Sequence, residues 1–120
     1  MDEKLQIIIN TLKQELKSSV LSCDLWLKKD KSSVIDYNNN FEFSSNFGNI
    51  INDFEKKLDF LGLPMFGNYA LYELEMDTVL LFINLGDNYI LGSLIDKSTI
   101  NLTSLLVITI PKIIKIFDDL

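Results

Sequence analysis

The chain has 120 residues, of which 48% are hydrophobic and 23% charged, so its composition is typical of one folded domain with a single core. All eleven positive residues are lysines, scattered along a chain whose net charge is −6. Nucleic-acid binding needs a clustered basic face, so the composition argues against it. The sequence contains no histidine and no arginine. It therefore lacks the usual general acid–base residue, the imidazole metal ligand and the arginine finger, and we expect neither an enzyme nor a cofactor.

The N-terminal part predicts a helix followed by a β-hairpin. Apolar residues recur at helical spacing over 3–17, with the charged residues mostly on the other side, which predicts an amphipathic helix. Over 21–27 apolar and polar residues alternate, as in a strand with one buried face. Residues 28–31 form a polar turn, and 32–37 are expected to complete the hairpin.

Residues 44–61 carry the most persistent helical pattern in the chain. Ser44 or Ser45 is expected to cap this helix, and Gly62 to end it. Phe60 widens the apolar stripe beyond what one packing surface needs, and a helix that is apolar on more than one side usually contacts two partners. The stripe consists of Phe43, Phe47, Ile50, Ile51, Phe54, Leu58 and Leu61.

Three closely spaced strands are predicted over 66–75, 78–84 and 88–96. The second and third are apolar with little alternation, which indicates central strands covered by helices on both faces. The first is apolar on both faces and has no charge before Glu73, so we place it at a sheet edge. Exposed edges normally carry Lys, Pro or a bulge that prevents pairing with another chain. This edge has none, so we expect a second copy or a partner to cover it.

The C-terminal segment, 101–120, predicts a last helix interrupted by Pro111. Proline in a helix interior removes a backbone hydrogen bond, so we expect either a kink or a helix that restarts with Pro111 in its first turn. A strand over 105–110 is the competing interpretation. The uncharged run 98–111 is shorter than the ~20 residues that span a bilayer, and no signal peptide is evident. We therefore expect a cytoplasmic protein without membrane insertion.

Few side chains suggest chemistry. Cys23 lies on the apolar side of its strand and no histidine is present to deprotonate it, so it is interpreted as a small core residue. Trp26 has two open interpretations: it anchors a partner or packs beneath a covering helix. No tight loop gathers several carboxylates, so we expect no metal site and interpret the acidic residues near strand ends as solvated turn residues. These are Asp24, Asp36, Asp87 and Asp96.

Two features of the sequence together resemble one known family. They are the order of the predicted elements and the run Val79-Leu80-Leu81-Phe82-Ile83-Asn84-Leu85-Gly86-Asp87-Asn88-Tyr89-Ile90-Leu91-Gly92-Ser93-Leu94-Ile95-Asp96-Lys97, which is followed by Ile100-Asn101-Leu102. Both are similar to the roadblock / dynein light chain domain family, of the bacterial or archaeal type that assists GTPases. The resemblance covers nearly the whole chain, so we expect a single domain over 1–120. It implies an α+β sandwich with a five-stranded antiparallel sheet, in the order helix-strand-strand-helix-strand-strand-strand-helix. The second helix would lie on one face, and the first and last helices on the other.

The resemblance also implies assembly. Members of this family form homodimers, or heterodimers with a paralogous roadblock domain, by joining their second helices and third strands into one continuous sheet. Two features depart from the family pattern, namely the first hairpin turn, Lys29-Asp30-Lys31, and Pro111. The residues of this chain that correspond to the family's dimer interface are Phe47, Ile51, Phe54, Leu58, Tyr69, Leu71 and Tyr72.

Three functions are compatible with this sequence. The first is a non-enzymatic homodimer that binds a small Ras-like GTPase and regulates it without donating an arginine finger. The second is a structural adaptor or light-chain-like scaffold subunit with no effect on nucleotide turnover. The third is a profilin-like or PAS-like small-ligand sensor, which the lack of polar groups in the expected core disfavours.

Overall fold

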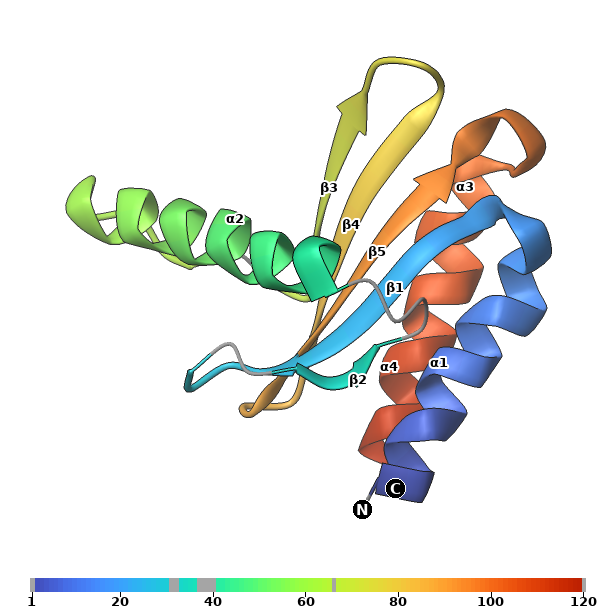
Figure 1. Ribbon diagram of the computed structural model, residues 1–120, viewed down its shortest axis with the longest axis horizontal. Coiled ribbons are helices and arrows are strands. Elements are labelled where there is room, and N and C mark those ends of the chain that lie inside the picture. Colours follow the sequence, from blue (N-terminus) through green and yellow to red (C-terminus); the bar gives the residue numbers. More distant parts are fainter. Residues whose placement is uncertain (1, 31–32, 37–40, 66, 120) are drawn as a thin grey trace.

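The computed structural model of the chain describes residues 2–30, 33–36, 41–65 and 67–119. An antiparallel sheet forms the middle layer, and helices cover both of its faces (Figure 1). Across the sheet the strands follow the order β2 (Ser33–Asp36), β1 (Val20–Leu27), β5 (Tyr89–Asp96), β4 (Thr78–Leu85) and β3 (Tyr69–Leu74). The first and last helices pack on one face and the second helix packs on the other, which gives a layered α+β architecture.

Four strands make up the regular part of the sheet, and each has six to eight residues. The observed ends agree with the predicted ones to within one residue, except that the first strand of the meander begins three residues after 66. Phe66 itself lies outside the described residues. In spatial order the four strands are β1 (Val20–Leu27), β5 (Tyr89–Asp96), β4 (Thr78–Leu85) and β3 (Tyr69–Leu74).

The second arm of the predicted hairpin is much shorter than the other strands. This segment, β2 (Ser33–Asp36), has four residues and pairs with β1 at three positions, with a register shift between Leu25 and Trp26. Only Val34 and Ile35 in this arm are strand-forming residues, and polar residues flank them on both sides. The prediction of a five-stranded sheet therefore needs correction: the regular sheet is four-stranded, and β2 adds only a short, irregular edge segment.

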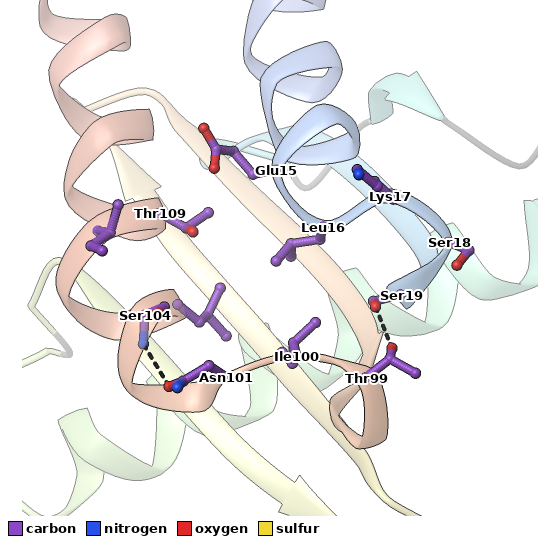
Figure 2. Close-up of a pocket in the computed structure, with 12 residues that line it drawn as sticks. Glu15, Leu16, Lys17, Ser18, Ser19, Thr99, Ile100, Asn101, Ser104 and Thr109 are labelled. Atoms are coloured by element: carbon purple, nitrogen blue, oxygen red, sulfur yellow. Dashed lines mark hydrogen bonds between the residues drawn. The ribbon is translucent and has the colours of Figure 1, made fainter.

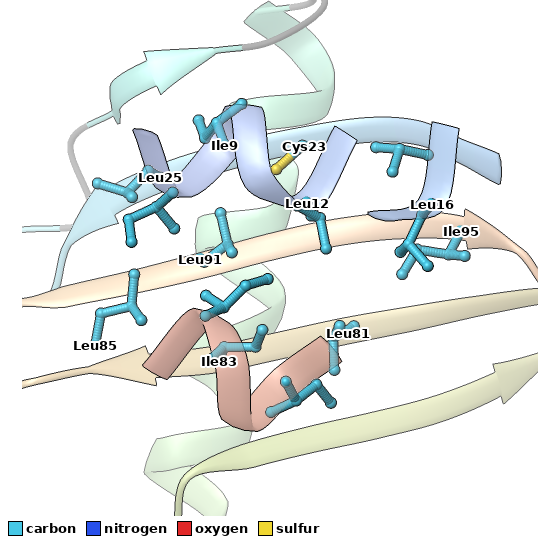
Figure 3. Packing of buried hydrophobic residues seen from close by; sticks show 14 of the residues in the cluster. Ile9, Leu12, Leu16, Cys23, Leu25, Leu81, Ile83, Leu85, Leu91 and Ile95 are labelled. Carbon is cyan, nitrogen blue, oxygen red and sulfur yellow. The ribbon is translucent and has the colours of Figure 1, made fainter. Parts of the chain in front are cut away.

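The main core lies between the sheet and two helices that run side by side, α1 (Asp2–Leu16) and α4 (Ile110–Asp118) (Figure 1). Alternate side chains of β1, β4 and β5 point toward these helices (Figure 3). Cys23 is fully buried among them, so its interpretation as a small core residue is confirmed. Other fully buried members are Ile8, Ile9, Leu12, Leu25, Ile83, Leu85, Ile95 and Ile113.

The last helical segment contains a π-helical turn. It begins as α3 (Leu102–Ser104), widens into the π turn over Leu105–Thr109 and continues as α4. Pro111 lies in the first turn of α4, as one of the two predicted arrangements requires, and the alternative strand over 105–110 is wrong. Proline cannot donate a backbone hydrogen bond, and its ring conflicts with the preceding helical turn, so the wider turn accommodates it.

The other face of the sheet carries a smaller core beneath α2 (Phe41–Phe60). Trp26 is 1% exposed here, and its ring centroid lies 6.4 Å from that of Phe82. Of the two interpretations of Trp26, the buried one is therefore correct. The remaining buried members of this smaller core are Ile51, Leu80 and Ile90.

The two ends of α2 differ in how well the sequence predicts them. The helix begins at Phe41, three residues before the predicted start, so the predicted caps Ser44 and Ser45 lie inside it. At the other end Gly62 takes a φ of 69°, and the amide of Leu63 donates to the carbonyl of Leu58 at 2.9 Å. This is a Schellman motif, which confirms Gly62 as the helix stop.

The predicted turn carboxylates have different environments. Asp87 is exposed in a turn, whereas Asp24 is fully buried in β1, on the same side as Trp26, so the prediction of a solvated residue is wrong there. Its Oδ1 accepts a hydrogen bond from the amide of Leu25 at 2.9 Å. The side chain of Asp36 lies outside the described part of the chain. Within the described ranges, no helix is long and apolar enough to cross a bilayer.

Replacing Gly92 tests the packing of this smaller core. A Cβ on Gly92 would collide with the six-membered ring of Trp26 and approach Phe82 Cδ1 at 3.4 Å. Gly92→Ala should therefore lower the free energy of unfolding by about 1–3 kcal/mol, measured by urea denaturation at a fixed protein concentration. Gly67→Ala is the matched control, because a Cβ at Gly67 meets nothing within 4 Å. Equal unfolding midpoints for the two variants would contradict this packing.

Candidate functional site

The end strand β3 presents an open sheet edge. It pairs with β4 from Tyr69 to Leu74, and no strand of the described residues pairs with its other side. The strand contains no proline, lysine or bulge that would discourage pairing. Tyr69 and Leu74 are 42% and 44% exposed at its two ends. The structure therefore leaves an apolar edge strand available to another chain.

The predicted interface residues of β3 divide between the two faces of the sheet. Leu71 lies opposite Leu81 and packs partly against the main core. Tyr72 lies opposite Leu80 on the α2 face and packs against the smaller core. Burial raises the pKa of the Tyr72 phenol, so this side chain stays neutral near neutral pH. A chain that pairs with this edge would meet apolar or neutral groups at Leu71 and Tyr72, and the carboxylate of Glu73 near the end of the strand.

The turn that follows β3 extends this edge with an exposed methionine. Met76 and Asp77 have φ values of 61° and 56°, as in a type I′ turn, although neither is glycine. Two hydrogen bonds of 2.8 Å stabilise the turn. Thr78 Oγ1 donates to the backbone carbonyl of Glu75, and the backbone amide of Lys97 donates to the backbone carbonyl of Asp77. Met76 is 92% exposed at the tip.

The second half of α2 projects beyond its own sheet (Figure 1). Ile51 is fully buried, and the ring of Phe54 packs edge-on against that of Tyr72, with centroids 5.8 Å apart. Beyond this contact the apolar side of the helix is no longer buried: Phe60 is 89% exposed and Leu61 is 66% exposed. These two residues and the stems of two lysines line an apolar hollow of about 490 Å³. The hollow is a surface of α2 that its own chain does not cover.

The seven residues predicted for a dimer interface occupy three kinds of environment. Tyr69 is exposed. Ile51 is buried within its own chain, and the side chain of Phe47 lies outside the described part of the structure. The other four are half-buried beside the open edge or on α2: Phe54, Leu58, Leu71 and Tyr72.

Other exposed apolar residues were missing from that predicted set. Phe60 and Leu61 continue the apolar stripe of α2 past the end of the sheet, a signal that the sequence contains. Leu74 follows Tyr72 in the alternation of β3, so the sequence pattern also allows its identification. Met76 could not be identified, because its exposure depends on the left-handed turn.

The surface formed by β3 and α2 contains groups suited to contacting another chain rather than to catalysis or metal binding. No group of three or more Cys, Asp or Glu residues in the described ranges could hold a metal ion. Glu73 on β3 forms an ion pair with Lys97, whose Nζ lies 3.4 Å from Glu73 Oε1. An exposed pair of this kind contributes little to stability. What the surface offers is therefore apolar area and backbone hydrogen-bonding groups.

Comparison with known proteins depends on structure, because no family model and no curated protein sequence matches the chain. Myxococcus xanthus MglB superposes with a TM-score of 0.71 and 16% identity, over 98% of this chain and 97% of that one. A roadblock/LC7 domain from Streptomyces avermitilis gives 0.67 and 13%, over 91% and 90%. The chain has the roadblock/LC7 fold. The resemblance read from the sequence is confirmed at this level.

A further similar structure is an MglB with a tetrameric arrangement. It superposes with a TM-score of 0.65 and 11% identity, over 97% of this chain and 91% of that one. All of these identities are low, so the likeness concerns the path of the backbone. Near-complete coverage of both chains means that the likeness extends over nearly the whole fold described above.

Replacing Asp77 tests whether the turn at Met76 is strained. Asp77→Gly removes the cost of a left-handed backbone at a non-glycine residue and should raise the free energy of unfolding by about 0.5–1 kcal/mol in urea denaturation. Asp87→Gly is the control, since Asp87 is exposed in the next hairpin turn without a positive φ. That variant should be neutral or less stable, because glycine adds entropy to the unfolded chain. An equal gain in both variants would refute the strain.

Proposed function

We propose that the chain is a non-enzymatic, dimeric roadblock-type module that binds and regulates a small Ras-like GTPase in the cytoplasm. One observation carries this proposal: the open edge of β3 and the unsupported half of α2 lie next to each other in the fold, joined by the contact between Phe54 and Tyr72. Two incomplete surfaces at one place are what a second copy of the chain would complete.

The strand edge supports pairing through the backbone. Two copies of β3 in antiparallel orientation would exchange backbone hydrogen bonds and join two sheets into one. In a two-fold symmetric dimer both copies contribute the same surface, so each contact between two residues of the two copies occurs twice. Leu71 and Tyr72 lie at the centre of the strand and Tyr69 near its start, which would place them at and beside that axis.

The projecting half of α2 supports burial of side chains. Fully burying one large apolar side chain contributes roughly 1.5–3 kcal/mol, so Phe60 and Leu61 together represent a substantial driving force. Leu63 and Met65, which follow the helix, are 50% and 45% exposed and would add to it. An isolated monomer would leave all four in water. The existence of an MglB with a tetrameric arrangement supports the view that this fold is used in assemblies.

The GTPase proposal depends on the fold and on what the chain lacks. The sequence resembles a family that assists small GTPases, and the fold is that of MglB and of roadblock/LC7 domains. Without arginine this chain cannot donate a finger to the transferred phosphate, so its regulation would consist of positioning the GTPase's own groups. The alternative is an adaptor that uses the same dimer without changing nucleotide turnover.

Charging the overhang of α2 tests dimer formation. Phe60→Asp should weaken self-association at least tenfold, because it places a carboxylate in an apolar contact while changing a side chain that is already 89% exposed in the monomer. Sedimentation equilibrium over a range of concentrations gives the dissociation constant, and circular dichroism verifies the fold.

The matched control is Val107→Asp, which introduces the same charge at a 64% exposed residue on the opposite side of the molecule. This variant should associate like the wild type. A wild-type chain that sediments as a monomer at micromolar concentration would refute the dimer, and equal weakening by both aspartates would show that the overhang has no special role.

Affinity capture from the native host, with immobilised wild-type protein and added GDP or a non-hydrolysable GTP analogue, tests the GTPase. We expect recovery of a small GTPase in one nucleotide state at least tenfold more strongly than in the other. The captured GTPase is then purified and its turnover measured with and without the module. Altered turnover supports regulation, unchanged turnover supports the adaptor, and recovery of no GTPase in either state argues against both.

A further inference from the structure

The face opposite α2 contains a pocket of about 460 Å³ that the proposed assembly does not use (Figure 2). It lies between the end of α1, the short turn Lys17–Ser19 that follows it, and the start of the last helical segment. Its lining combines apolar side chains with an unusual number of hydroxyls. The hydroxyl-bearing residues are Ser18, Ser19, Thr99, Ser104 and Thr109.

Hydrogen bonds fix the walls of this pocket. Ser19 Oγ and Thr99 Oγ1 lie 2.6 Å apart and connect the end of α1 to the turn after β5. Asp96 holds that turn: its Oδ1 accepts from the hydroxyl of Ser98 at 2.7 Å and from the amide at 2.9 Å, and these bonds lower the pKa of the Asp96 carboxyl. Asn101 Oδ1 accepts from the amide of Ser104 at 3.1 Å and caps the last helical segment. The pocket is therefore formed before any ligand arrives.

Thr109 contributes a hydroxyl to the pocket wall. It is 4% exposed, and its hydroxyl points into the pocket (Figure 2). Within the described residues this hydroxyl makes no hydrogen bond, and its oxygen is not enclosed by the protein, so a group that enters the pocket can reach it. Leu105 and Ile110 of the same helical segment are buried. The hydroxyl of Thr109 is therefore available to hydrogen-bond a ligand in this pocket.

The charges around the pocket favour an anion. The Glu15 carboxylate lines the pocket, but it is ion-paired with Lys112. Lys17 lines the mouth and has no carboxylate partner among the described residues. The side chain of Asn101 uses its oxygen for the cap, which leaves its NH₂ group as a donor. Lys17 thus provides a cation at the pocket, while the charge of the lining carboxylate Glu15 is balanced by Lys112.

We propose that this pocket binds a small amphipathic oxyanion, a carboxylate or a phosphate ester with a short apolar body. Hydroxyls of Thr109 and Ser104 donate hydrogen bonds to the oxyanion, and Lys17 neutralises it. The apolar body packs against Leu16 and Ile108, which line the same pocket. Since α2 and β3 contribute no residue to this lining, binding does not require the dimer and would let the module respond to a metabolite.

Amide NMR titration of the full chain with sodium hexanoate, hexyl phosphate and hexylammonium chloride, at equal ionic strength, tests this site. We expect saturable shifts at Lys17, Ser104 and Thr109 with at least one of the two anions, and at least tenfold weaker binding of hexylammonium. Whichever anion binds more tightly identifies the oxyanion. Equal binding of the cation, or no saturable shift with either anion, would overturn the proposal.

Variants separate the site from general surface effects. Thr109→Val keeps the shape, removes the hydroxyl and should weaken anion binding at least fivefold, whereas Thr103→Val, an exposed position in the same helical segment, should leave it unchanged. Lys17→Gln should weaken it similarly, with Lys115→Gln as the charge-matched control outside this pocket. Wild-type affinity in both Thr109→Val and Lys17→Gln would refute the assignment even if the anions bind elsewhere.

Discussion

The rest of the fold depends on two central strands that are apolar on both faces. β4 and β5 cannot expose either side to water, so helices must cover the sheet twice. The chain satisfies the two faces unequally. The helices α1 and α4 bury most of one face, whereas on the other face Phe60 and Leu61, at and just past the end of α2, stay exposed. The unequal cover explains why the unburied apolar area gathers on α2 and beside β3.

This inequality divides the molecule into a side with uncovered apolar surface and a side with a closed core. On the α2 side, large apolar side chains such as Phe60 and Leu61 remain exposed, and the open edge of β3 lies beside this helix. On the other side, α1 and α4 close the main core, and the irregular parts of the backbone gather at their ends, around a polar pocket. A protein partner and a small molecule could therefore occupy the chain at the same time.

Much of this was readable from residue periodicity, because helices and strands with one buried side repeat at fixed intervals. The stripe of α2, the helix stop at Gly62 and the core position of Cys23 follow from such local rules. Tertiary context decided the rest. Asp24 occupies a strand position that the fold happens to bury, β2 is cut short by its polar flanks, and the projection of α2 depends on where the sheet ends. The open edge was predictable, but the pocket at Thr109 was not, since its walls come from segments distant in sequence.

The π turn in the last helical segment also sets the phase of everything after it. One additional residue in a helical turn rotates the following helix by about 100° relative to the preceding one. Leu105 at the start of the turn and Ile110 and Ile113 after it are all buried, so two different helical registers are combined in one continuous helical segment. Deleting one residue from the turn would keep the composition of the segment but rotate α4 away from the sheet, so the length of this turn, more than its residue types, holds the two halves in their common orientation.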